Sequence, residues 1–107
     1  MEIGALSDNE LAVSLDSLAQ RDRENVVEFI RYLNEFDSRG LFLELGYSSL
    51  FVYCTKRLKL SAGASYRRTN AATCLRENPE LEALLLSGDV TLRWWQRLKA
   101  LKRRWFL

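Results

Sequence analysis

Apolar residues recur along this chain at spacings of three and four positions, which is the period of an amphipathic α-helix. A first predicted helix starts at a capping-box pair, Ser7 and Glu10, and ends where charged residues crowd at residues 19–22. Three leucines share one face of it: Leu11, Leu15 and Leu18. A second predicted helix covers about residues 23–37. Its candidates for burial are Val26, Phe29, Ile30, Leu33 and Phe36.

Further helical segments follow, separated by glycine and proline. The apolar run LFLEL ends at Gly46, whose missing side chain suits a helix end. Pro79 opens a helix that ends at Ser87, since proline is favoured in a first helical turn. Its inward residues are Leu81, Leu84 and Leu85. Thr91 can cap a last helix, so the pattern predicts a compact, all-α, multi-helix domain over residues 1–107.

The most specific pattern is a pair of helices joined by a short turn, at about residues 48–76. The first helix, SSLFVYCTKRL, has Ser48 or Ser49 as its cap, and the second, SAGASYRRTNAATCL, has Ser61. Only two residues separate the helices, and the second of these, Leu60, is placed to fill the corner between them. This spacing is typical of a helix-turn-helix.

Length and composition agree with this interpretation. A chain of 107 residues with 48% apolar residues and one proline fits a single helical domain with a modest core. No apolar run is long enough to cross a bilayer and the N-terminus has no leader pattern, so we expect a soluble, cytoplasmic protein. Cys54 and Cys74 lie inside predicted helices without a CxxC motif, and buried thiols are favoured over a disulfide.

Charge is unevenly distributed between the two halves of the chain. Residues 1–54 hold ten acids and four bases, whereas residues 55–107 hold twelve bases and four acids. A basic half favours an anionic partner, either nucleic acid or an acidic membrane surface. The alternative is that the two halves neutralise each other within the fold.

The last predicted helix, at about residues 91–106, is both cationic and amphipathic. Its apolar stripe consists of Leu92, Trp95, Leu98, Leu101 and Trp105. Its bases are Arg93, Arg97, Lys99, Lys102, Arg103 and Arg104. Such a helix can pack its stripe on the core while its bases bind phosphates, can lie on an anionic membrane, or can dock with a solvated basic face. Trp94 and Phe106 lie off the stripe, so self-association is a further option.

The residues needed for common catalytic sites are missing. The sequence has no histidine, which removes the commonest general base and transition-metal ligand. It also has no P-loop and no GxGxxG motif. We therefore expect no enzymatic activity, no cofactor and no metal site.

The run LFLELGYSSLFVYCTKRLKLSAGASYRRTNAATCL, followed by NPELEALLLSGDVTL, resembles a known family. It is similar to the helical region that precedes the nuclease domain in bacterial HNH endonuclease-family proteins. The likeness covers about residues 6–92 and is closest over 43–54, 60–61 and 66–68. The order of the predicted helices is also similar, more weakly, to the helix-turn-helix part of ParB-like partition proteins. The resemblance implies a helical, DNA-associated module that ends before any catalytic part.

Three departures from that family pattern limit what the resemblance carries over. An HNH nuclease uses histidines to hold its metal and activate water, and this chain has none. Gly63 and Thr69 stand where the family favours an acidic and an aliphatic residue, and Gly63 weakens its helix by ~1 kcal/mol relative to alanine. The C-terminal segment, rich in Trp and Arg, also differs from the family pattern. An alternative is therefore that the chain is a truncated or diverged remnant of such a protein.

The leading functional hypothesis is a non-catalytic module that binds double-stranded DNA by inserting the helix at 61–75 into the major groove. The expected groove residues are Ser61, Ser65, Tyr66 and Asn70, although Tyr66 could equally be core. The expected phosphate contacts are Lys56, Arg57, Lys59, Arg67, Arg68, Arg97, Lys102, Arg103 and Arg104. Replacing Arg67 and Arg68 together is expected to lower DNA affinity without lowering stability.

Two other partners remain as alternatives to DNA. One is a protein partner or a second copy, which would contact Trp94, Trp95, Trp105 and Phe106. The other is a membrane surface, bound by the C-terminal helix.

Overall fold

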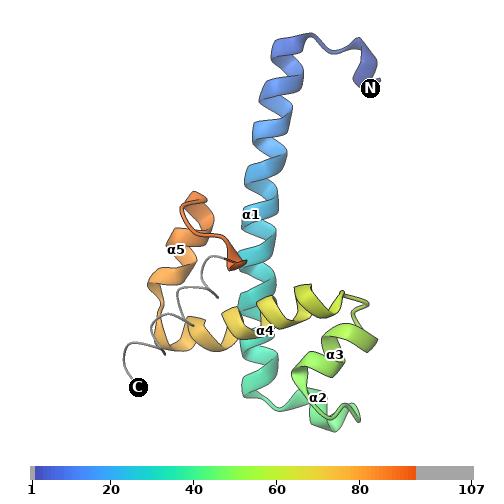
Figure 1. Ribbon diagram of the computed structural model, residues 1–107, viewed down its shortest axis with the longest axis vertical. Helices are drawn as coiled ribbons and strands as arrows, with labels where there is room; N and C mark the ends of the chain where they lie inside the picture. Colours follow the sequence, from blue (N-terminus) through green and yellow to red (C-terminus); the bar gives the residue numbers. More distant parts are fainter. Residues whose placement is uncertain (1, 94–107) are drawn as a thin grey trace.

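The computed structural model describes residues 2–93 and is all-helical over this range, which confirms the predicted fold class (Figure 1). One short 3-10 helix precedes five α-helices within the described residues. In chain order they are η1 (Ile3–Ala5), α1 (Asp8–Ser38), α2 (Leu41–Glu44), α3 (Leu50–Lys56), α4 (Ala62–Glu77) and α5 (Glu80–Ser87).

Helix α1 is one continuous helix of 31 residues, so the predicted break at residues 19–22 is wrong. Ala19, Gln20 and Arg21 are good helix formers, and side-chain pairs bridge the expected break: Gln20 Nε2 donates to Glu24 Oε1 at 3.4 Å and Arg23 donates to Gln20 Oε1. The predicted capping box is confirmed, with the Glu10 amide donating to Ser7 Oγ at 3.1 Å. Despite the length of α1, none of the helices in residues 2–93 is apolar enough to cross a membrane.

The core lies where α4 and α5 pack on the C-terminal half of α1. Helix α1 contributes Val27, Ile30 and Leu33, whereas Val26, predicted as core, is half-buried at its edge. The rest of this core cluster consists of Leu50, Cys54, Ala71, Ala72, Cys74, Leu81, Leu85 and Val90. Both cysteines are buried free thiols, as predicted.

Helix α4 crosses α1 and contacts α3 near one end and α5 near the other, so it is the central element of the packed region (Figure 1). Ala71 and Ala72 of α4 are both buried in the core, and side chains this small allow packed helix backbones to approach closely. The N-terminal half of α1 instead projects beyond the other helices (Figure 1). Leu15 and Leu18 lie on this half with 65% and 53% of their surface exposed.

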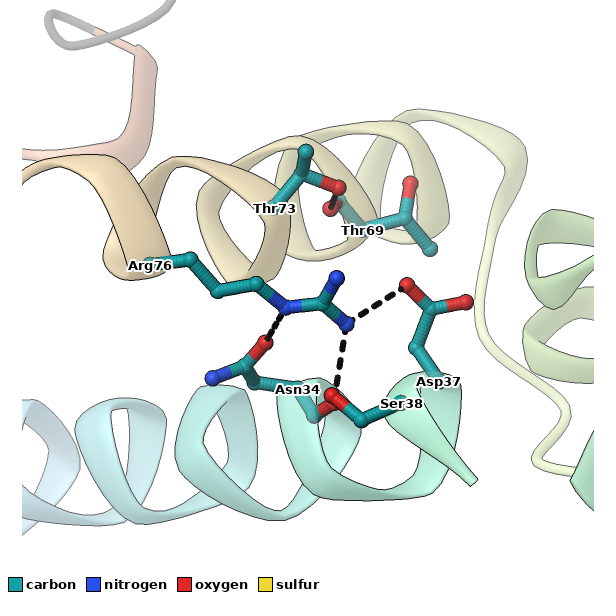
Figure 2. Close-up of polar contacts among 6 residues, drawn as sticks. All are labelled: Asn34, Asp37, Ser38, Thr69, Thr73 and Arg76. Atoms are coloured by element: carbon teal, nitrogen blue, oxygen red, sulfur yellow. Dashed lines mark hydrogen bonds and ion pairs between the residues drawn. The ribbon is translucent and has the colours of Figure 1, made fainter. Parts of the chain in front are cut away.

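A polar clamp joins the C-terminal end of α4 to the C-terminal end of α1 (Figure 2). The Arg76 guanidinium donates from Nε to Asn34 Oδ1, and from Nη2 to the Asn34 carbonyl at 3.2 Å and to Asp37 Oδ2 at 3.0 Å. The Asn34 carbonyl belongs to the last turns of α1, where positive charge is favourable. The clamp therefore fixes the crossing of the two helices through a base from the second half of the chain and an acid from the first.

We expect Arg76→Ala to lower the free energy of unfolding by about 1 kcal/mol, because it removes three hydrogen bonds that hold α4 to α1 at a half-exposed site. The matched control is Arg39→Ala, which removes the pair between Arg39 and Glu35 within one segment and is expected to cost about 0.5 kcal/mol or less. Urea denaturation of both variants measures the difference, and equal losses would contradict a role for the clamp.

Candidate nucleic-acid interface

Two helices, α3 and α4, lie where the sequence predicted a helix-turn-helix, but the predicted two-residue turn is wrong, because five residues separate them. Ser49 and Ser61 are the N-caps, and each hydroxyl accepts a backbone amide at 3.1 Å, from Val52 and Ala64 respectively. Helix α3 is shorter than predicted, since its last residue is Lys56. The turn places the partly buried Leu60 against the core, as expected from its corner position.

The turn contains an unusual backbone conformation at Lys59. Its φ of 62° lies in the left-handed region, which costs a residue with a side chain about 1–2 kcal/mol. Among residues 2–93, Lys59 is the one non-glycine residue with a positive φ. The strain is located at an exposed cation, between the end of α3 and the cap of α4.

Aromatic contacts hold the helix-turn-helix against α1. The ring of Tyr53 on α3 stacks on Phe36 of α1 with centroids 4.6 Å apart and meets Tyr47 edge-on at 5.1 Å. The guanidinium of Arg68 on α4 lies 4.7 Å from the ring centroid of Phe29 of α1. Both helices of the unit are therefore attached to the same buried half of α1.

Four cations gather around the turn and the start of α4, and we call them the basic corner: Lys56, Arg57, Lys59 and Arg67. The first three are exposed and Arg67 is half-exposed. None of the four has an ion-pair partner within residues 2–93. No acidic residue occurs between Glu44 and Glu77 in the sequence, so the positive charge here is not offset locally.

Arg67 and Gly63 are neighbours on the first turns of α4. A Cβ at position 63 would lie 3.2 Å from Arg67 Nη1, so the absent side chain leaves room for the guanidinium beside the helix N-terminus. A cation is unfavourable at that end of a helix dipole, and an anion bound between them would relieve both charges. Tyr66, 51% exposed, lies on the same end of α4, so the alternative that it belongs to the core is wrong.

Several other predicted site residues face inward. Ser65 is fully buried and its hydroxyl has no hydrogen-bond partner among the described residues, so its predicted place at a groove edge is wrong. Arg68 packs on Phe29, and burial lowers the pKa of its guanidinium, with a further lowering by Arg67. Asn70 is half-buried rather than exposed.

The buried thiol of Cys54 lies close to Arg68 in this inward-facing region. Burial raises the pKa of Cys54, and the nearby Arg68 charge opposes that shift. A buried thiol with a raised pKa forms little of the reactive thiolate at neutral pH. Within residues 2–93 no three His, Cys, Asp or Glu side chains lie together as a metal site would require.

Sequence reasoning missed the clamp residues and could not place the last helix. Arg76 was not singled out, and nothing in its local pattern distinguishes it from a solvated base, because Asn34 and Asp37 lie about forty positions away in the chain. The remaining predicted contacts lie outside the described residues: Arg97, Lys102, Arg103, Arg104, Trp94, Trp95, Trp105 and Phe106.

Comparison with known proteins gives no independent guide to this site. No family model, no curated protein and no solved structure matches the chain. The interpretation of the basic corner therefore depends on its own geometry and charge.

We expect Lys59→Gly to raise the free energy of unfolding by about 0.5 kcal/mol, because relief of the left-handed strain exceeds the added freedom of the unfolded chain. Lys56→Gly makes the same chemical change at a right-handed helical position and is expected to lower it by a similar amount. Opposite signs in thermal or urea denaturation support the assigned turn, whereas destabilisation by both variants contradicts it.

Substitutions of the neighbouring Arg67 and Arg68 are expected to have different effects on the free energy of unfolding. Arg68→Ala should lower the free energy of unfolding by about 1 kcal/mol through loss of the contact with Phe29, whereas Arg67→Ala should change it by less than about 0.5 kcal/mol. Urea denaturation of each single variant measures this split. It replaces the expectation that both arginines can be removed without loss of stability, and equal effects would contradict the inward placement of Arg68.

Proposed function

We propose that this chain is a non-catalytic DNA-binding module that contacts duplex DNA through the basic corner and the first turns of α4. The observation that carries the proposal is the set of four cations without ion-pair partners in residues 2–93, gathered at the turn of a helix-turn-helix. Phosphate neutralisation by such cations supplies most of the affinity in non-specific DNA binding. The resemblance to the helical region of HNH endonuclease-family proteins agrees with this class of partner.

In the proposed complex the N-terminal end of α4 approaches the DNA, and the rest of α4 remains packed against the other helices. Recognition helices of this kind present their N-terminal residues to the major groove. Tyr66 is a large exposed side chain on that end, and its ring and hydroxyl suit a sugar or a base edge. Lys56, Arg57 and Lys59, exposed at the end of α3 and in the turn before α4, would contact phosphates.

The C-terminal half of α4 takes no part in the proposed contact. Arg76 is bound to Asn34 and Asp37, and the hydroxyls of Thr69 and Thr73 donate back to the α4 backbone carbonyls of Tyr66 and Thr69. Glu77 adds a negative charge at the helix end. The buried face of α4 is held by α1, so only its first turns are available to enter a groove.

We expect DNA affinity to fall with salt at a log-log slope of about −3.6, since four phosphate contacts on duplex DNA each contribute about −0.9. Arg57→Ala and Arg67→Ala should each make the slope shallower by about 0.9. Arg39→Ala is the matched control, because Arg39 is exposed, paired with Glu35 and far from the basic corner in the chain.

Fluorescence anisotropy with a short labelled duplex at several salt concentrations gives these slopes. An affinity that does not change with salt would reject the proposal. A slope reduced equally by Arg39→Ala would reject the basic corner as the contact surface.

A further inference from the structure

The N-terminal half of α1 carries an apolar stripe that residues 2–93 leave exposed at two of its three positions and half-buried at the third, Leu11. We define the α1 stripe as Leu11, Leu15 and Leu18, which lie at spacings of four and three along one side of a continuous helix. Leu15 and Leu18 are 65% and 53% exposed. The stripe continues the line of Phe29, Leu33 and Phe36, which α3 and α4 cover further along the same helix. Its exposure therefore results from where the other helices end.

We propose that the α1 stripe is an interface with a second copy of this chain, in which the two α1 helices pack antiparallel. With Leu15 of one copy against Leu15 of the other, Leu11 falls opposite Leu18 on both sides of a twofold axis. All three leucines of each copy are then covered by the same three of its partner. This isologous arrangement is the commonest form of homodimer contact.

Charge along α1 favours the antiparallel direction over the parallel one. Asp8 and Glu10 lie at the N-terminal end of the stripe, whereas Arg21 and Arg23 lie at its C-terminal end with Asp22 between them. In the antiparallel pair Glu10 faces Arg21 of the second copy on one flank. On the other flank Asp8 comes opposite Asp22, beside an Arg23 that donates to Gln20 of its own helix, so the pairs of Glu10 with Arg21 carry the charge argument. A parallel pair would instead bring the acids of both copies together at one end.

Sedimentation equilibrium of the full chain across a wide concentration range tests the pairing. The mass should rise from the monomer value of 12.4 kDa towards twice that value as concentration increases. Leu15→Glu should keep the chain monomeric, and it should not unfold the protein, because Leu15 lies outside the core. The matched control is Val13→Glu, which adds the same charge to the same helix about 160° around its axis from Leu15, at a residue 59% exposed.

A wild-type chain that stays monomeric overturns the proposal, and so does equal loss of dimer in both variants. Direction is tested with a short bis-maleimide cross-linker on Glu10→Cys and Arg21→Cys variants, since native Cys54 and Cys74 are buried. Cross-linking in the mixture of the two variants supports the antiparallel pair, whereas cross-linking of Glu10→Cys with itself overturns it. Both measurements are made without DNA, so they stand apart from the proposed function.

Discussion

The crossing of α4 over the C-terminal half of α1 is the contact on which the rest of the structure depends. Small residues at positions 71 and 72 let the backbones approach, Ile30 and Leu33 fill the contact from α1, and Arg76 fixes one end by reaching Asn34 and Asp37. Helices α3 and α5 then pack on either side of α4. A helix of low amphipathicity in sequence thereby becomes the centre of the fold.

That crossing also divides α4 into parts with different properties. Its inner face buries Ser65, places Arg68 on Phe29 of α1 and brings Arg76 to Asp37 of α1. On its first turns the exposed Tyr66 lies near the exposed cations of the preceding turn. Any anionic partner of this module therefore meets a corner of the molecule rather than the whole length of a helix, and this explains why some bases of α4 are structural and others are free.

The bases of the chain fall into two groups, those that pair with an acid from the other half of the chain and those that do not. Arg76 and Arg31 form ion pairs that join the halves of the chain, with Asp37 and Glu82 respectively, as the neutralisation alternative required. Lys56, Arg57, Lys59 and Arg67 take no part in this within the described residues. The neutralisation alternative therefore holds for Arg31 and Arg76, whereas the four cations of the basic corner have no acidic partner in residues 2–93.

Local sequence was sufficient for the all-α class, the caps at Ser7, Ser49 and Ser61, the burial of both cysteines and the pairing of α3 with α4. These features depend on spacing and on hydrogen bonds within a few residues, which a sequence displays directly. The continuity of α1 was missed because crowded charges were taken as a helix end, whereas they form favourable pairs within a helix.

Only the tertiary structure decided which face of each helix is covered. Ser65 and Arg68 look like exposed donors in the sequence, and Leu15 and Leu18 look like core. The packing reverses each of these roles, because burial depends on where α1 and α4 cross and on where the neighbouring helices stop. Those positions are set by contacts between residues about forty positions apart, such as Asn34 and Arg76, and helical periodicity carries no information about them.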